Sequence, residues 1–197
     1  MSEKNLFWQN SKVSYDDRCR QMGQKGLAVW FTGISGSGKS TIAVEVERLL
    51  YEKGVKAYLL DGDNLRHGIN SDLGFSAEDR NENIRRVAEI ARLFCDACMV
   101  TLVSFISPFQ EMRKRAKELI GSERFIEVYV KADIAVCKAR NPKGLYTKTI
   151  EKFTGIDSPY EPPEYPDITL DTEKLSVSEA AKRVIEKIYE RGMINGI

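Results

Sequence analysis

Apolar runs alternate with amphipathic stretches along most of this chain of 197 residues. The apolar runs predict strands, which span residues 27–32, 57–60, 99–106, 125–130 and 168–170. Stretches with apolar residues three or four positions apart predict helices, which span residues 39–53, 77–96, 109–120, 134–140 and 177–191. Strands that are apolar on both faces and alternate with helices are typical of a parallel sheet covered by helices on both sides. We therefore expect a three-layer α/β fold around a five-stranded parallel sheet.

The first predicted strand leads directly into a glycine-rich loop. Residues 33–40 read Gly-Ile-Ser-Gly-Ser-Gly-Lys-Ser, and a helical pattern follows. Glycines let backbone N–H groups curl around a polyphosphate, and the helix directs its positive N-terminus at the same anion. Lys39 is expected to contact the β- and γ-phosphates, and the Ser40 hydroxyl to bind Mg²⁺. The predicted ATP-binding residues of this loop are Gly33, Ile34, Ser35, Gly36, Ser37, Gly38, Lys39, Ser40 and Thr41.

A second group of candidates follows the next strands. Ligands of parallel α/β sheets bind at the carboxyl ends of the strands, where we expect Asp63 and Ser107 to join the phosphate-binding loop. Asp63 can hold Mg²⁺ and can orient or deprotonate an attacking hydroxyl. Asp61 is instead interpreted as structural, accepting hydrogen bonds from N–H groups at the end of its strand. Arg66 is close enough in sequence to share the site of Asp63.

The predicted helix 77–96 has one apolar face that would pack on the sheet. Extending that face backwards by one turn reaches Arg80, with Asn83 beside it, at the end of the helix where a buried guanidinium is unexpected. For Arg80, a structural ion pair and a ligand contact are both open interpretations. Arg85 and Arg86 lie off this face and are expected to face solvent. Ser76 predicts the start of the helix through a capping box with Asp79 three positions later.

The same apolar face continues through Cys95 and Cys98. These two residues form a Cys-x-x-Cys pair, but neither a second pair nor a histidine cluster completes a zinc site, since His67 is the only histidine. We interpret both cysteines as buried thiols.

The composition is ordinary for a globular domain, with 42% hydrophobic and 30% charged residues and a formal net charge of +1. A net charge this small argues against a general electrostatic attraction to nucleic acid or to a membrane surface. Residues 1–17 show no apolar core of a secretory signal, and no run approaches the ~20 apolar residues of a membrane span. We expect a cytoplasmic protein with an N-terminal surface arm at 1–24 and one domain at 25–197.

Six segments closely resemble the adenylyl-sulfate kinase (APS kinase) family, and the likeness runs from about Trp8 to the C-terminal helix. They span residues 61–66, 74–80, 82–86, 105–108, 143–146 and 153–158. The resemblance implies a phosphate-loop fold of the nucleoside-kinase type, usually a homodimer, with a mobile lid at 141–158. It implies transfer of the γ-phosphoryl group of ATP, with Mg²⁺, to the 3′-hydroxyl of adenosine 5′-phosphosulfate (APS), giving 3′-phosphoadenylyl sulfate in sulfate assimilation.

The resemblance also implies roles for individual residues. Lys39, Asp63 and Ser107 would be catalytic, Ser40 and Asp63 would hold the metal, and Arg140 would cover the ATP base. The residues that would bind APS are Asp63, Arg66, Phe75, Arg80, Asn83, Ile106, Ser107, Lys143, Leu145 and Phe153. Among them, the rings of Phe75 and Phe153 would sandwich the adenine.

Two points stay open within this resemblance. The phosphoryl group could pass through a phosphoserine at Ser107 or move directly from ATP to the acceptor. We favour direct transfer because Pro108 suggests that Ser107 lies in a fixed turn. The segment 147–152 is shorter and less basic than the family usually has between its Tyr and Phe-Thr-Gly, which affects lid closure more than the reaction.

Two other functions are considered. One is a kinase for another small hydroxylated metabolite, which would not be expected to carry the APS-kinase segments together. The other is a regulatory nucleotide-sensing domain, against which the presence of Lys39, Ser40 and Asp63 argues.

Overall fold

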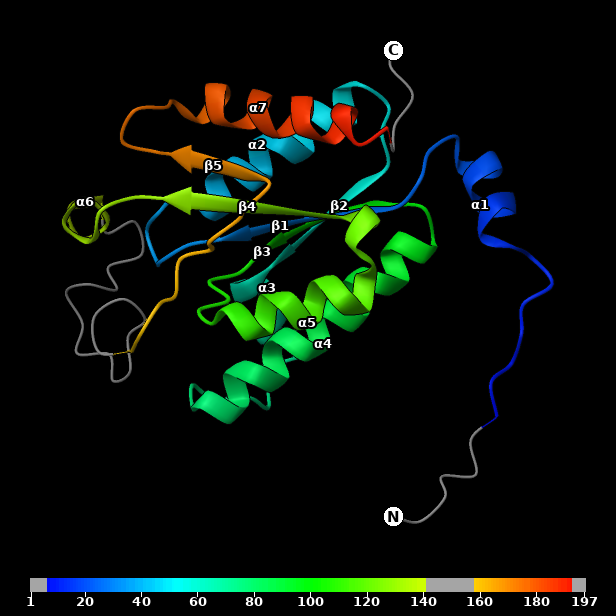
Figure 1. Cartoon of the computed structure of the whole chain (residues 1–197), viewed down its shortest axis with the longest axis horizontal. Coiled ribbons are helices and arrows are strands. Elements are labelled where there is room, and N and C mark those ends of the chain that lie inside the picture. Colours follow the sequence, from blue (N-terminus) through cyan, green and yellow to red (C-terminus); the bar gives the residue numbers. More distant parts are fainter. Residues whose placement is uncertain (1–6, 141–157, 193–197) are drawn as a thin grey trace.

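A computed structural model describes residues 7–140 and 158–192. Its centre is one parallel sheet in the order β2-β3-β1-β4-β5 (Figure 1). The strands are β1 (Leu27–Thr32), β2 (Ala57–Asp61), β3 (Val100–Ser104), β4 (Phe125–Lys131) and β5 (Ile168–Asp171). All five predicted strands and their parallel arrangement are confirmed. The largest difference is β3, which ends at Ser104 although the apolar run continues through Ile106, because hydrophobicity alone does not mark where strand pairing stops.

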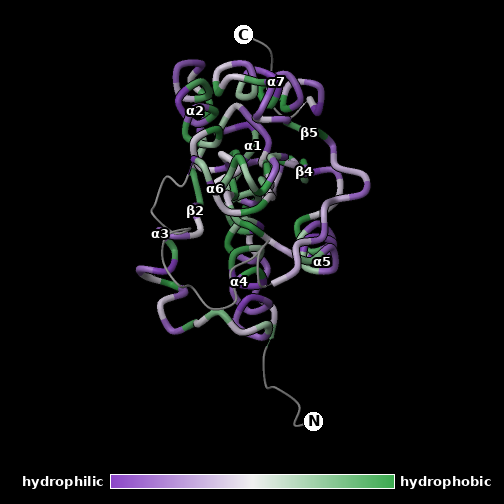
Figure 2. Tube along the Cα trace, turned by 90° about the vertical axis from the view of Figure 1, so that its left-hand side faces the viewer, coloured by the Kyte–Doolittle hydropathy of each residue, from purple (hydrophilic) through white to green (hydrophobic). Residues whose placement is uncertain are grey.

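Helices cover both faces of the sheet (Figure 1). On one face lie α2 (Lys39–Glu52) and α7 (Val177–Glu190), and on the other lie α4 (Ala77–Asp96) and α5 (Gln110–Ile120). The short helix α6 (Ile134–Arg140) follows β4. In Figure 2 the turns of α7 and α5 alternate between hydrophilic and hydrophobic, as expected for helices with one buried face. Within the described ranges, no helix is long and apolar enough to cross a membrane.

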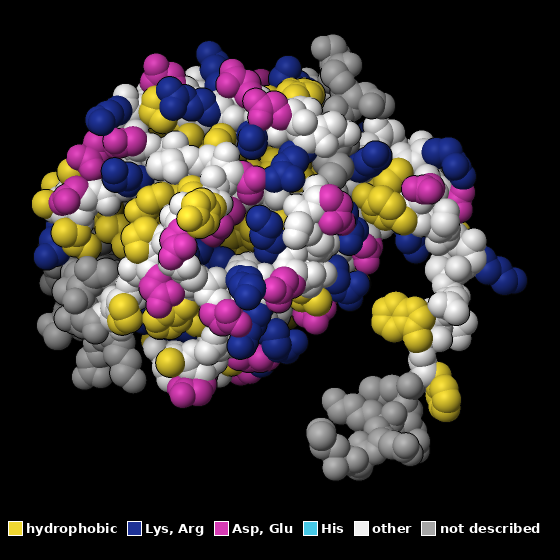
Figure 3. Space-filling model, viewed as in Figure 1, with side chains coloured by type: hydrophobic (Ala, Val, Ile, Leu, Met, Phe, Trp, Pro, Cys, Tyr) yellow, Lys and Arg dark blue, Asp and Glu magenta, His cyan; other side chains and the backbone are white. Residues whose placement is uncertain are grey.

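Three short elements were not predicted: α1 (Tyr15–Met22), α3 (Gly62–Arg66) and the 3-10 helix η1 (Ser122–Arg124). The helix α1 falls within the predicted N-terminal arm and begins at a capping box formed by Ser14 and Asp17. It contacts the rest of the protein, because the Gly26 N–H donates to the Tyr15 hydroxyl over 3.0 Å. Before α1, the chain extends away from the main body and exposes hydrophobic side chains (Figure 3).

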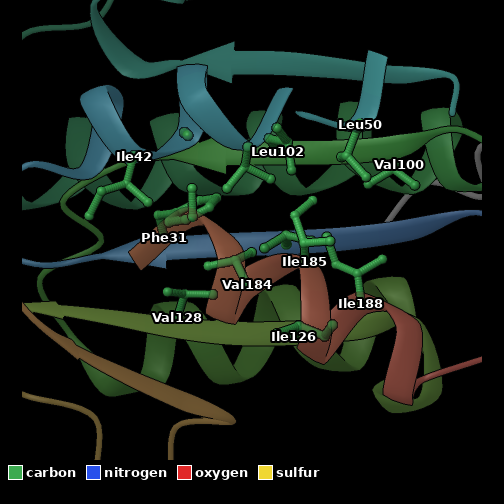
Figure 4. Close-up of a cluster of buried hydrophobic side chains, with 14 of the residues drawn as sticks. Phe31, Ile42, Leu50, Val100, Leu102, Ile126, Val128, Val184, Ile185 and Ile188 are labelled. Carbon is green, nitrogen blue, oxygen red and sulfur yellow. The ribbon is translucent and has the colours of Figure 1, made fainter. Parts of the chain in front are cut away.

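The alternating side chains of β1 connect the two layers of helices. Leu27, Val29 and Phe31 point into the core under α2 and α7, part of which Figure 4 shows. Ala28 and Trp30 point into the second core, under α4 and α5. Every residue of β1 is buried, so the loop that follows it starts from a strand fixed on both sides. Cys95 and Cys98 are fully buried, which confirms their interpretation as core thiols.

Candidate active site

Three segments meet at the carboxyl edge of the sheet. The phosphate-binding loop follows β1, the helix α3 follows β2, and the turn at 105–108 follows β3. The register aligns Asp61 with Ser104 and Ser104 with Phe31, so the ends of the three strands lie side by side. The strand order therefore brings together residues that are far apart in the sequence.

The backbone of the phosphate-binding loop depends on its glycines. At Gly33, φ is +150° and an added Cβ would lie 2.4 Å from the Val130 carbonyl oxygen, so a side chain is excluded there. Gly38 precedes α2 with φ of +103° and has no side chain to cap the helix. The first N–H groups of α2 can therefore donate to an anion.

Lys39 lies at the first position of α2 and is only 8% exposed. Its Nζ donates to the Ile34 carbonyl oxygen across the loop, over 2.9 Å. This contact holds the ammonium group above the loop, where an anion bound by the loop would meet a positive charge.

The hydroxyl of Ser40 faces the end of β2. Its Oγ donates to Asp61 Oδ2 over 2.7 Å and lies 3.2 Å from Ser104 Oγ. The other carboxylate oxygen of Asp61 accepts from the Asp63 N–H over 3.0 Å and caps α3, which confirms the structural role expected for Asp61. The contact with Ser40 was missed, since finding it requires the order of the strands.

These oxygens suit Mg²⁺, which prefers carboxylate, hydroxyl and phosphate oxygens and keeps several waters. Asp63, in the first turn of α3, is exposed beside them. Within residues 7–140 and 158–192, no group of three or more His, Cys, Asp or Glu side chains could hold a metal. An ion at this edge would thus depend on Ser40, an aspartate and the phosphate oxygens of a bound nucleotide.

Two arginines and an aromatic ring lie between the end of α3 and the first turn of α4. The Arg66 guanidinium lies 4.4 Å from the centre of the Phe75 ring and donates to the Leu73 carbonyl oxygen over 3.0 Å. Arg80 Nε donates to the Phe75 carbonyl oxygen over 3.1 Å. Burial lowers the pKa of both guanidinium groups, and the charge of Arg66 further lowers the pKa of Arg80. A guanidinium group whose charge is disfavoured by burial, and in Arg80 also by a second arginine, is suited to binding an anion.

The capping box of Ser76 and Asp79 fixes the first turn of α4, as predicted. One turn later, buried Asn83 accepts through its Oδ1 from Asn70 Nδ2 over 2.8 Å. Arg85 is exposed, as expected. Arg86 is only 28% exposed because it forms ion pairs with Asp72 and Glu82, which the helical pattern did not reveal.

The turn after β3 is tightly held. Ser107 has φ of +45°, which is unusual for a residue with a side chain, and is 1% exposed. Its Oγ accepts from Trp30 Nε1 over 3.0 Å. The Ile106 carbonyl oxygen accepts from Thr32 Oγ1 over 2.6 Å. The hydroxyl of Ser107 thus contacts an indole of the core.

The last predicted ATP contact lies next to the loop. Both terminal nitrogens of Arg140 donate to Thr172, over 2.9 Å to its Oγ1 and 2.7 Å to its carbonyl oxygen. Thr172 Oγ1 in turn donates to the Ser37 carbonyl oxygen over 3.1 Å. Thr172 was missed, since it follows a strand that is remote in sequence. The remaining predicted site residues lie outside the described residues, and they are Lys143, Leu145 and Phe153. Most of the predicted lid lies there as well.

Comparisons with known proteins agree with this geometry. The family model for adenylylsulphate kinase matches residues 25–171. An adenylyl-sulfate kinase of Staphylococcus carnosus is 48% identical over 98% of this chain and 100% of its own length. One of Clostridium acetobutylicum is 51% identical over 96% of each chain.

Solved structures give the same result. The APS kinase of Mycobacterium tuberculosis in complex with AMPPNP and APS is similar with a TM-score of 0.81 and 48% identity, over 84% of this chain and 99% of that one. A sugar kinase from Janibacter, 20% identical with a TM-score of 0.61, shares the fold alone. This chain belongs to the adenylylsulphate kinase family.

Proposed function

We propose that this protein transfers the γ-phosphoryl group of ATP to the 3′-hydroxyl of APS, producing 3′-phosphoadenylyl sulfate and ADP. The observation that carries the proposal is the similarity to the M. tuberculosis APS kinase, whose structure contains AMPPNP and APS. The likeness covers 99% of the chain in that structure, which supports assigning two nucleotide sites rather than the phosphate-binding loop alone.

The donor site is the loop at 33–41 with Lys39 and Arg140. Phosphoryl transfer depends mainly on alignment and on neutralising charge, because the protein makes little covalent contribution. The N–H groups at the start of α2 and the buried ammonium group of Lys39 supply positive charge for the triphosphate. The anchoring of Arg140 through Thr172 to the loop supports its assignment to the nucleotide base.

Ser40 and Asp63 are assigned to Mg²⁺, and Asp61 holds the Ser40 hydroxyl from behind. When bound, the ion neutralises charge on the phosphates of ATP. Asp63 has a second assignment, which is to orient the 3′-hydroxyl of APS and accept its proton. Its place beside the loop, at the first turn of α3, supports both assignments.

The acceptor site comprises Arg66, Arg80, Phe75, Asn83 and the turn at 106–107. The two partly buried guanidinium groups would bind the phosphosulfate, and the ring of Phe75, which is 60% exposed, is available to stack on the adenine. Lys143, Leu145 and Phe153 are assigned to the same substrate from the family resemblance alone.

Transfer is proposed to be direct, without a phosphoserine at Ser107. The burial of this side chain and the hydrogen bond from Trp30 support the proposal, because a phosphate on Oγ would have to displace the indole N–H. The backbone of the turn then matters more than the hydroxyl.

We infer that the working unit is a homodimer in the cytoplasm, where its donor ATP is used. Phe7 and Trp8 are 95% and 84% exposed and offer aromatic surface that a second subunit could cover. Light scattering should give twice the 22.3 kDa of one chain. The mass of a monomer, or of a hexamer as in the APS kinase of Thiobacillus denitrificans, would contradict a dimer.

The function is tested by measuring ADP release in the presence of ATP, Mg²⁺ and a panel of acceptors: APS, a nucleoside, shikimate and gluconate. We expect release that depends on APS, with 3′-phosphoadenylyl sulfate as the product in mass spectrometry. Release with another acceptor and not with APS would identify a different metabolite kinase. Binding of nucleotides without turnover would indicate a sensing domain.

A further inference from the structure

Arg113 of α5 lies outside the residues assigned above to either nucleotide, yet its side chain is only 3% exposed. A guanidinium group stays charged at neutral pH, so a buried one requires several hydrogen-bond partners. Its three nitrogens donate to three separate parts of the chain. Nε donates to Glu127 Oε1 of β4 over 2.8 Å, Nη1 to the Ser107 carbonyl oxygen over 2.6 Å, and Nη2 to the Glu161 carbonyl oxygen over 2.8 Å.

One of these partners is a carboxylate and two are backbone carbonyl groups. Glu127 balances the charge and is itself 14% exposed. The two carbonyl contacts fix the turn after β3 and the connector that leads into β5. The bonds that satisfy the remaining donors of Arg113 thus also tie two separate segments to α5.

The same two segments are also bonded to each other. The Glu161 N–H donates to the Pro108 carbonyl oxygen over 2.8 Å, and Glu161 Oε2 accepts from the Gln110 N–H over 2.7 Å. The Tyr160 hydroxyl lies 3.1 Å from Thr32 Oγ1, which donates to Ile106. Arg113 therefore lies at the centre of a network around the turn at 106–108.

The turn needs such support because of its backbone. A φ of +45° is seldom adopted by residues other than glycine, and persists only where the surroundings impose it. At Ser107, the Trp30 indole N–H donates to the side-chain oxygen and Arg113 donates to the carbonyl oxygen.

We propose that Arg113 is a positioning residue, which sets the place of Ile106 and Ser107 against the acceptor nucleotide. The proposal rests on the proposed function, because the acceptor contacts of these two residues come from it. Arg113 acts through the turn and touches neither nucleotide. A displaced turn should weaken the acceptor site more than the donor site, whose loop follows β1 and leads into α2.

The test compares Arg113→Met and Arg113→Lys with Arg115→Met, a control on the same helix whose side chain is 71% exposed and pairs with Glu111. The readouts are KM for APS, Kd for AMPPNP without acceptor, and thermal unfolding. For Arg113→Met we expect KM for APS to rise about tenfold or more, because small displacements at reacting groups are costly. We expect Kd for AMPPNP to change by less than about twofold.

Arg113→Lys should recover part of the loss, since lysine keeps the charge but cannot donate in three fixed directions. If Arg113→Met does not fold, Arg113→Lys carries the test, with a selective rise in KM for APS expected. The proposal is overturned if a folded Arg113 variant keeps the wild-type KM for APS, or if both nucleotides are affected equally. A wild-type protein that does not phosphorylate APS would instead overturn the proposed function, and this inference with it.

Discussion

At the scale of single residues, the site reuses side chains that also build the fold. Asp61 caps α3 with one carboxylate oxygen and holds the Ser40 hydroxyl with the other. Lys39 is buried by the loop that it is proposed to serve. Their variants therefore need a check of folding beside every measurement of rate.

Lys39→Ala is expected to be folded and nearly inactive. Removing one charge-stabilising group from a phosphoryl-transfer site commonly lowers kcat on the order of a hundredfold or more. APS-dependent ADP release measures the loss, and circular dichroism checks the fold. Lys114→Ala, at a side chain that is 68% exposed, serves as the control. Wild-type turnover by Lys39→Ala would reject its assigned role.

Asp63→Ala is expected to lose turnover to a similar degree, because the 3′-hydroxyl loses its proposed base and the metal loses one carboxylate. The same assay, repeated across Mg²⁺ concentrations, separates the two contributions. Excess Mg²⁺ should not restore the rate, since the base would still be missing. Full activity at any Mg²⁺ concentration would remove Asp63 from catalysis.

Ser107→Ala should keep most of the wild-type activity and should not trap labelled phosphate. The reason is that the proposed transfer does not use the hydroxyl, and the carbonyl contact with Arg113 is unchanged by the substitution. Rates with γ-labelled ATP and APS check this directly. Complete loss of activity in a folded variant would support a phosphoserine instead.

At the scale of elements, the helices and strands with a strong hydrophobic pattern were predicted, and those with a weak one were missed. The five strands and the long helices were predicted because their apolar residues fall in short runs or recur three or four positions apart. The helix α3 was missed because it spans only Gly62–Arg66 and starts from a glycine, so it shows no periodicity. The helix α1 was missed because, of its residues, none is buried and its sequence is largely polar. The end of β3 was misjudged because apolar residues continue past the pairing.

The helix α4 also carries an ion-pair network whose contribution to the stability of the fold is expected to depend on pH. Glu82 accepts from Arg85 and Arg86, and these hydrogen bonds lower its pKa from the usual 4.5 to about 2. The native protein thus binds this proton more weakly than the unfolded chain does. The resulting stabilisation is complete above about pH 4.5 and is lost as the pH falls toward 2.

We therefore expect Glu82→Gln to lower the free energy of unfolding at neutral pH and to flatten its decline between pH 4.5 and 2. Urea unfolding across this range measures the effect, and Glu78→Gln in the first turn of α4 is the matched control. An equally steep decline in the Glu82 variant would show that these ion pairs contribute nothing measurable, as surface pairs sometimes do.

At the scale of the whole molecule, the strand order β2-β3-β1 assembles the site. The loop, Asp63 and the carboxyl edge could be predicted from local sequence and from the general rule for parallel sheets. The partners of these residues could not, because the contacts of Ser40 with Asp61 and of Arg140 with Thr172 join segments that only the fold brings together. The acceptor assignments came from the family resemblance, since a pattern of charges does not by itself specify a sulfated nucleotide.

The net charge of +1 is consistent with this arrangement. Two anionic nucleotides must meet in the proposed reaction, and the positive charge proposed to receive them comes from Lys39, Arg66 and Arg80. The central claim is therefore geometric: both nucleotides occupy one edge of the sheet, with the acceptor hydroxyl next to Asp63.

A crystal structure of this chain with AMPPNP, Mg²⁺ and APS tests that claim most directly. We predict the triphosphate in the loop at 33–40, and the sulfated nucleotide beside Arg66, Phe75 and Arg80 with its 3′-hydroxyl within hydrogen-bond distance of Asp63. The sulfated nucleotide bound elsewhere, or its 3′-hydroxyl turned away from Asp63 and the γ-phosphate, would contradict the account.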